Sequence, residues 1–127
     1  MSNLNIPEGY QAIMPYIIVD NPEGLKQFMI TVLGAKLKMH HPNPDGSFGH
    51  AEVTIGDSCI MFSNTMPEWG VNTAGLFVYV EDADAAYKLA LDNGATSLMP
   101  PADQDYGRTC GVKDPFGNTW WITSVKG

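Results

Sequence analysis

His50 and Glu52 are the two residues of this 127-residue sequence whose types and spacing best suit proton transfer. They lie two positions apart in an alternating segment, so both side chains leave the same face of a β-strand. A carboxylate beside an imidazole orients the ring and stabilises its charged form near neutral pH, as general acid–base chemistry requires. A structural pair at a polar rim is the alternative, and the sequence leaves both interpretations open.

Arg108 is a further candidate, because it is the one basic residue that the expected alternation places on this face. A guanidinium group binds the carboxylate or phosphate of a ligand through two parallel hydrogen bonds. A salt bridge with Asp105 or Glu52 is the alternative interpretation. Tyr106 lies just before Gly107 and Arg108, where its hydroxyl would close the mouth of a cavity or its ring would pack at a turn.

The sheet is expected to curve around a cavity on the face of His50 and Glu52, and flat and apolar side chains make up the rest of its lining. The same alternation places five of them there, namely Tyr16, Met61, Phe77, Tyr79 and Trp121. Each of these alone would ordinarily be a core residue, but together they offer rings on which an aromatic molecule can stack. Trp120 is expected to face a helix, and an exposed Trp69 would indicate a lid or a dimer contact.

Cys59 and Cys110 also fall on this face in the expected register. A nucleophilic thiol needs a neighbouring base and a lowered pKa, and His50 is the one histidine placed beside them. We therefore interpret both cysteines as small buried residues. Two cysteines form no disulfide framework, and the first residues show no secretory signal, so we expect a cytoplasmic protein.

These side chains are positioned by two halves of the chain that echo each other. Residues 15–39 lie over residues 76–99 at an offset of 60 or 61, and residues 60–62 lie over 120–122 at an offset of 60. Hydrophobic periodicity predicts a strand, a helix and three strands in each half. A helix covers one face of a four-stranded sheet and leaves the other open. The sequence therefore predicts an α+β fold, with two tandem βαβββ modules forming a curved mixed sheet around a cavity.

The element boundaries follow from capping residues, turns and alternation. The first helix begins at Asp20-Asn21-Pro22 and ends at Gly34. The second helix is predicted at 83–92, and the strands are predicted at 13–19, 36–41, 48–55, 59–63, 76–80, 96–99, 107–113 and 119–125. We expect a single domain over residues 1–127, with the first module at about 11–64, a linker at 65–73 and the second module at about 74–126.

The charge of the chain excludes several classes of partner. Seven Lys and Arg against fourteen Asp and Glu give a net charge of −7. Binding to nucleic acid or to an anionic membrane requires a basic surface, so neither is expected. The sequence also contains no glycine-rich nucleotide-binding loop, so neither NAD nor S-adenosylmethionine is supported as a cofactor.

An ordered set of motifs resembles the vicinal oxygen chelate superfamily, which comprises glyoxalases, bleomycin resistance proteins and dioxygenases. The chain is most similar to its PhnB-like branch. The motifs cover nearly the whole chain, and they are IPEGY (6–10), PYIIV (15–19), GHAEV (49–53), DQDYG (103–107) and DPFGNTW (114–120). The resemblance implies a glyoxalase/bleomycin-resistance fold.

Metal-dependent members of this family hold a metal with four ligands from the first and last strands of the two modules. The resemblance places these positions at Met14, Met61, Gly75 and Trp121. Glycine has no side chain, and thioethers and indoles do not bind the metals that these enzymes use. We therefore expect no metal site and no cofactor.

Two main functions follow from these residues. The first is a metal-free protein that binds a small, partly aromatic molecule in the sheet-lined cavity. The alternative is a small lyase-, isomerase- or dioxygenase-like enzyme that uses His50 and Glu52 for acid–base or metal chemistry. A third possibility is an interaction module whose own side chains fill the cavity. The resemblance and the unpaired sheet edges predict a homodimer, with modules paired within a chain or exchanged between chains.

Overall fold

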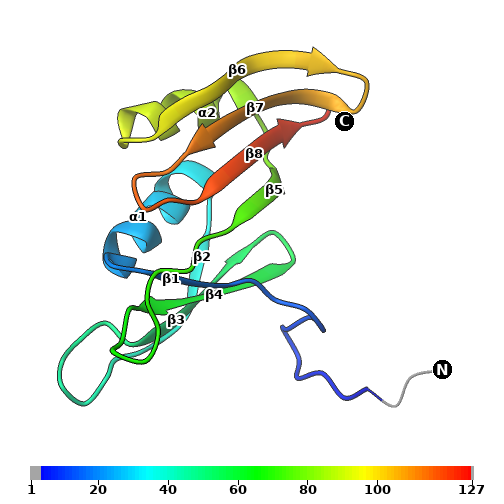
Figure 1. Ribbon diagram of the computed structural model, residues 1–127. Helices are drawn as coiled ribbons and strands as arrows, with labels where there is room; N and C mark the ends of the chain where they lie inside the picture. The colour runs from blue at the N-terminus through cyan, green and yellow to red at the C-terminus, as the bar shows by residue number, and fades with distance from the viewer. Residues whose placement is uncertain (1–3, 127) are drawn as a thin grey trace.

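A computed structural model describes residues 4–126 and contains two βαβββ modules (Figure 1). Module 1 contains β1 (Tyr16–Val19), α1 (Pro22–Leu33), β2 (Lys36–His41), β3 (His50–Ile55) and β4 (Ser58–Asn64). Module 2 contains β5 (Gly75–Tyr79), α2 (Ala83–Asp92), β6 (Thr96–Gln104), β7 (Gly107–Lys113) and β8 (Thr119–Ser124). The order of elements confirms the predicted repeat and the α+β class, whereas the predicted domain limits, residues 1 and 127, lie outside the described residues.

Both helices begin at a side-chain cap that the sequence indicates. The Asn21 side chain accepts a hydrogen bond from the Gly24 amide at 3.0 Å, and Pro22 opens α1. The Asp82 side chain accepts one from the Ala85 amide at 3.1 Å at the start of α2. Helix α1 ends at Gly34, whose φ of 70° favours glycine. Local sequence therefore determines where α1 starts and stops.

The strands form two four-stranded mixed sheets, ordered β1-β4-β3-β2 and β5-β8-β7-β6. In each sheet the first and last strands of the module pair in parallel, and the other neighbours are antiparallel. Helices α1 and α2 contact each other, and Figure 1 shows the two sheets spreading away from this pair. Each sheet therefore has one face toward the helices and one face away from them, called its open face below.

One continuous core joins the helices to the sheets of both modules. Ala51 and Val53 face α1, as predicted from alternation, and both are fully buried. Trp120 is also buried in this core, as expected. Side chains that point toward the helices are therefore buried in the core, and the side chains between them along each strand point to the open face.

Most predicted strand boundaries lie within two residues of the observed ones, and two differ by three residues or more. Strand β6 continues to Gln104, because Ala102, Asp103 and Gln104 pair with the first residues of β7. Its two prolines are tolerated because β6 is an edge strand. Strand β1 begins at Tyr16 rather than at residue 13, directly after Pro15, which has no amide proton to donate.

No helix among residues 4–126 is both long enough and apolar enough to cross a bilayer.

Candidate functional site

The open face of module 1 carries the predicted proton-transfer pair. Strand pairing places Met61 between Tyr16 and Glu52, and it places Ser63 opposite His50. Because directly paired residues share a face, these five side chains lie together on the open face. The alternation predicted for β1, β3 and β4 is therefore confirmed.

His50 and Glu52 form part of a chain of four hydrogen-bonded side chains. The Nε2 atom of His50 lies 2.7 Å from Oε2 of Glu52, and Nδ1 of His50 lies 3.1 Å from the Tyr16 hydroxyl. The Tyr10 hydroxyl donates to Oε1 of Glu52 at 2.5 Å. Glu52 is buried, whereas Tyr16 is half exposed. The chain therefore runs from a buried carboxylate to a phenol at the surface.

The carboxyl group of Glu52 is held in its charged form. Burial by itself raises the pKa of a carboxyl group, but the hydrogen bonds from His50 and Tyr10 outweigh burial and lower the pKa of Glu52. The same carboxylate raises the pKa of Tyr10 to about 12, through the hydrogen bond first and then through burial and charge repulsion. At neutral pH this arrangement therefore contains a carboxylate and a protonated Tyr10.

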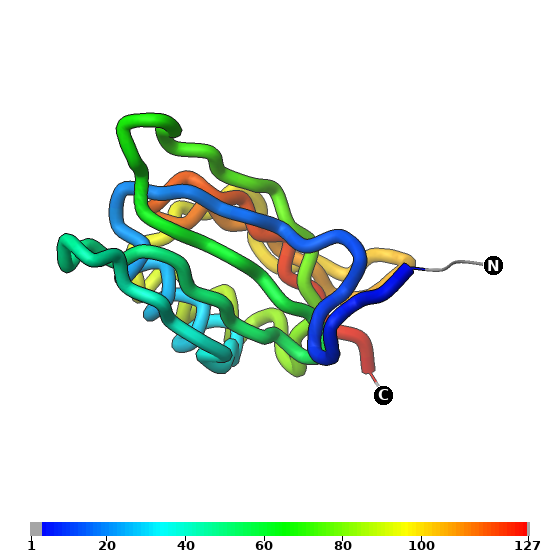
Figure 2. Tube along the Cα trace, turned by 90° about the horizontal axis from the view of Figure 1, so that it is seen from below, coloured from blue at the N-terminus to red at the C-terminus, as the bar shows by residue number. Residues whose placement is uncertain are grey.

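The segment before β1 closes over this face, and sequence reasoning missed its contribution. Figure 2 shows the N-terminal segment (dark blue) turning beside the β3–β4 end of module 1. Gln11 bonds with Cys59 through both amide atoms, at 2.9 Å and 3.3 Å. The Lys38 ammonium donates to the Gly9 carbonyl at 3.0 Å and lies 3.9 Å from the centre of the Tyr10 ring. The signal available in the sequence is the IPEGY motif, which ends in Tyr10.

The open face of module 2 is aromatic and uncovered within the described chain. Phe77 lies 5.3 Å from Tyr79 in an edge-to-face arrangement and 6.1 Å from Tyr106, measured between ring centres. Trp121 pairs with Phe77 across the β5–β8 ladder, so its side chain shares this face. All four rings predicted for module 2 therefore lie on one side of its sheet.

Gly111 leaves room for the Trp121 ring. The two residues are paired between β7 and β8, and a Cβ atom on Gly111 would overlap Cζ3 of the indole. The ring therefore lies against the strand backbone of β7. This contact fixes the indole on the open face.

The prediction that Arg108 and Cys110 share the cavity face is wrong. Cys110 pairs with Ile122 and Arg108 with Ser124, and Ile122 belongs to the core on the helix side. The pairing of the last two strands differs between the modules by one residue. Glu52 of β3 pairs with Met61, nine positions later, whereas Gly111 of β7 pairs with Trp121, ten positions later. A slip by one residue moves every side chain of a strand to the opposite face.

Arg108 forms ion pairs on the helix side instead. Its Nε lies 2.7 Å from Asp84 Oδ1, and its Nη1 lies 3.2 Å from Asp103 Oδ1. The ion-pair interpretation therefore holds, although its partners are Asp84 and Asp103 rather than Asp105 or Glu52. The hydrogen bonds to these carboxylates raise the pKa of the already cationic Arg108.

Both cysteines are buried free thiols. Burial raises the pKa of Cys59, and it raises the pKa of Cys110 to about 11. Neither thiol is therefore activated as a nucleophile.

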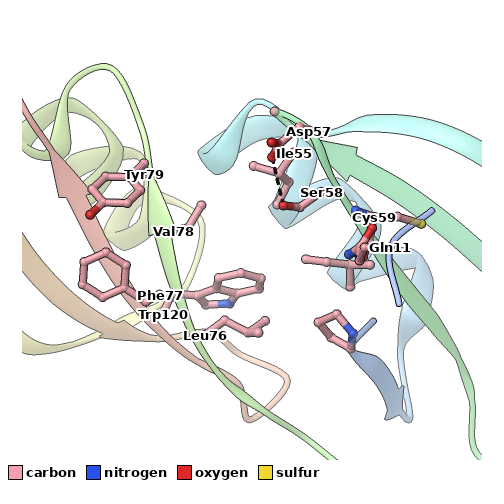
Figure 3. A pocket seen from close by; sticks show the side chains of 13 residues that line it. Gln11, Ile55, Asp57, Ser58, Cys59, Leu76, Phe77, Val78, Tyr79 and Trp120 are labelled. Carbon is pink, nitrogen blue, oxygen red and sulfur yellow. Dashed lines mark hydrogen bonds between the residues drawn. The ribbon is translucent and has the colours of Figure 1, made fainter. Parts of the chain in front are cut away.

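A pocket of about 330 Å³ lies between β4 of module 1 and β5 of module 2. Figure 3 shows Leu76, Phe77 and Trp120 on one side of it and Ile55, Ser58 and Gln11 on the other. Strand β5 borders this pocket at the edge of its sheet. Its lining is mainly apolar, because Ile60 and Val78 add to the apolar side chains on both sides.

A smaller pocket of about 180 Å³ lies beside the proton-transfer pair. It is lined by Tyr16, His50, Ser63 and Trp69, together with Asn43, Gly49, Asn64 and Met66. Trp69 is 57% exposed and comes from the segment between the modules, where Met66 and Trp69 form a short bridge. This indole therefore borders a space next to His50.

The four positions that the family resemblance assigns to metal ligands do not fit a metal ion of the usual kind. Met61 and Trp121 lie on the open faces of the two sheets, and Met14 lines a third pocket with Met61. Gly75 offers no side chain. Within residues 4–126, no three His, Cys, Asp or Glu side chains gather in a way that would hold a metal ion. The residues present therefore suit apolar contact rather than metal coordination.

Comparison with known proteins gives one family. The model of the Glyoxalase/Bleomycin resistance protein/Dioxygenase superfamily matches residues 10–122. The uncharacterized protein Mb0911c of Mycobacterium bovis is 29% identical over 121 residues, which cover 86% of this chain and 80% of that protein. The match to the uncharacterized protein Rv0887c of Mycobacterium tuberculosis has the same identity and covers 86% of this chain and 71% of that protein.

Solved structures share the fold at low identity. TioX from Micromonospora sp. ML1 has a TM-score of 0.73 at 22% identity, covering 90% of this chain and 98% of that one. The PhnB protein from Bacillus cereus has a TM-score of 0.72 at 16% identity, covering 91% and 100%. A glyoxalase/bleomycin resistance protein from Streptomyces sp. CB03234 has a TM-score of 0.67 at 21% identity, covering 87% and 96%. These structures confirm the predicted fold, and the family model confirms the resemblance.

Proposed function

The chain belongs to the Glyoxalase/Bleomycin resistance protein/Dioxygenase superfamily, and we propose that it binds a small, partly aromatic molecule without a metal ion. The observation that carries the proposal is the group of four rings on the open face of module 2. Phe77, Tyr79, Tyr106 and Trp121 are 40–63% exposed. Apolar rings that gather on an exposed face are typical of a binding surface.

The chemistry of this face supports an aromatic ligand rather than a charged one. The cation expected there, Arg108, lies on the other face and is paired with two carboxylates. Tyr79 and Tyr106 add hydroxyl groups that can orient a ligand with a polar edge. We therefore propose an uncharged aromatic molecule as the ligand class.

We propose that a second copy of the chain supplies the other wall of the cavity. A flat face leaves one side of a stacked ligand in water, and the open edges of the two sheets favour pairing between chains. We expect size-exclusion chromatography with light scattering to give twice the mass of the 127-residue chain. A monomer at micromolar concentration would contradict this proposal.

Replacing Trp121 by alanine is expected to weaken aromatic binding on the order of tenfold or more, because a central indole is removed from the stacking surface. The probe is N-phenyl-1-naphthylamine, an uncharged aromatic amine whose fluorescence rises in an apolar site. Titration of the wild-type protein should give saturable binding. Leu89→Ala, which removes an exposed apolar side chain of α2, should bind like the wild type.

Gly111→Ala tests the position of the ring without removing it. The added methyl group would displace the far end of the Trp121 side chain, so we expect weaker probe binding at nearly unchanged stability. Equal affinity in wild type, Trp121→Ala and Gly111→Ala would place the ligand elsewhere.

We also propose a cytoplasmic location. Cys59 and Cys110 are both free and buried, which supports a compartment in which thiols stay reduced.

A further inference from the structure

We infer that Tyr16, His50 and Glu52 form a metal-independent proton-transfer site in module 1, which acts on a small uncharged carbonyl compound. This site is separate from the aromatic face of module 2 and does not depend on ligand binding there. The inference rests on three observations: the order of the hydrogen bonds, the burial of one end of the chain and the pocket at its other end.

The positions of the protons follow from the partners of each atom. Oε1 of Glu52 accepts from Tyr10, and Oε2 of Glu52 accepts from His50. A carboxylate has no proton to donate, so Nε2 of His50 must carry the hydrogen of that bond. In the neutral ring, Nδ1 then carries no hydrogen and accepts through its lone pair, so the Tyr16 hydroxyl donates to it at 3.1 Å. The carboxylate thus selects the tautomer whose free nitrogen faces Tyr16.

The two ends of this chain differ in exposure. The Glu52 side chain is only 5% exposed, the His50 side chain is 29% exposed, and Tyr16 is 48% exposed. Tyr10 covers the buried end and retains its proton, because the pKa of its hydroxyl is raised. Exchange with a bound molecule therefore takes place at the Tyr16 hydroxyl, next to the pocket that Tyr16 and His50 share.

The lining of the pocket indicates the class of substrate. None of the eight described residues that line it is Lys, Arg, Asp or Glu, so no permanently charged side chain is there to pair with an ionic group. Ser63 supplies a hydroxyl, and Trp69 and Met66 supply apolar walls. A volume of about 180 Å³ holds a molecule of a few non-hydrogen atoms. A short ketone or hydroxyketone satisfies these conditions.

The proposed step balances without a co-reactant. The proton on the carbon next to the carbonyl moves to the Tyr16 oxygen, while the Tyr16 proton moves to Nδ1 of His50. The carbon keeps the electron pair of the broken C–H bond, so the substrate becomes an enolate and His50 becomes an imidazolium. Glu52 stabilises that charge at 2.7 Å and acts as a positioning residue. Return of a proton to the enolate restores the carbonyl compound or gives its isomer.

The test uses hydroxyacetone in D₂O, with deuterium incorporation at its carbon atoms followed by NMR. The wild-type protein should accelerate the exchange over the buffer rate. Tyr16→Phe should lose roughly a hundredfold of that acceleration, in the range typical of a positioned acid–base group. Tyr87→Phe removes a hydroxyl that bonds to Ser97 at 2.7 Å, far from this pocket, and should exchange like the wild type.

A second measurement reads the relay without any substrate. Nitrogen-15 NMR of His50 at neutral pH should show the proton on Nε2 in the wild type, and Glu52→Gln should reduce the preference for that tautomer. Exchange at the buffer rate, equal exchange in Tyr16→Phe and wild type, or a His50 proton on Nδ1 would each overturn the inference. Loss of aromatic probe binding in Trp121→Ala leaves these results unchanged, so the two proposals fail separately.

Discussion

Replacing Asp114 by alanine is expected to lower the free energy of unfolding by about 3–4 kcal/mol, because four hydrogen bonds to one buried carboxylate are lost. Oδ1 accepts from the amides of Phe116 and Asn118 at 2.8 Å and 2.9 Å. Oδ2 accepts from the Asn118 side chain at 3.0 Å and from Nε1 of Trp120 at 2.8 Å. Asp114 is 4% exposed and Trp120 is 1% exposed, so water reaches these donors poorly.

The consequence extends beyond one turn. Asn118 also accepts a hydrogen bond from the Ala74 amide at 2.9 Å, which links the β7–β8 turn to the start of β5. Thermal unfolding followed by circular dichroism should show a Tm lower by on the order of 10 °C.

Two matched variants sharpen this test. Asp114→Asn keeps one acceptor oxygen but places an amide N–H₂ beside the Trp120 N–H, so we expect an intermediate loss of stability. Asp92→Ala removes an exposed carboxylate from the end of α2 and should change the free energy by less than about 0.5 kcal/mol. Equal stability of Asp114→Ala and Asp92→Ala would contradict the assigned hydrogen bonds.

Replacing Glu52 by alanine is expected to lower stability by about 2–3 kcal/mol at pH 7, because Tyr10 and His50 lose a shared buried partner. The N-terminal segment loses one of its attachments to the open face of module 1. Denaturant unfolding should report the loss of stability. Limited proteolysis should show faster cleavage before Tyr16.

The difference in stability between the wild type and Glu52→Gln is expected to depend on pH, and the sign of this dependence follows from the pKa of Glu52. The pKa of Glu52 is lower in the folded protein than the value of about 4.3 in an unfolded chain. The carboxylate therefore contributes its full stability above the unfolded-state pKa and loses it as the pH falls through the folded-state pKa. The stability difference between wild type and Glu52→Gln should be largest near pH 6–7 and should shrink below about pH 4. A difference that grows toward low pH would show that the pKa is raised instead.

Local features of the sequence were sufficient for most of the elements. The predicted range 83–92 for α2 and the ranges for β2 and β7 agree with the structure. Caps at Asn21 and Gly34 depend on neighbours only a few residues away, so they are readable from sequence. Alternation in β3 likewise placed Ala51 and Val53 in the core.

The internal repeat could not predict which side chains of β7 point to the open face. The first module joins β3 to β4 through Gly56 and Asp57, whereas the second joins β7 to β8 through five residues, Asp114–Asn118. The longer turn shifts the pairing by one residue, and a shift of one inverts the faces. Arg108 consequently lies against α2 rather than in the cavity.

The two βαβββ modules, the core side of β3 and the closeness of His50 and Glu52 can be predicted from the sequence, because periodicity and short spacing are properties of local segments. Three contacts become visible in the folded chain alone: Tyr10 bonds to Glu52, Tyr16 bonds to His50, and the Trp121 ring packs against Gly111. The two hydrogen bonds join residues 42 and 34 positions apart. Contacts at such separation are set by strand register and by the path of the N-terminal segment, and neither leaves a periodic trace in the sequence.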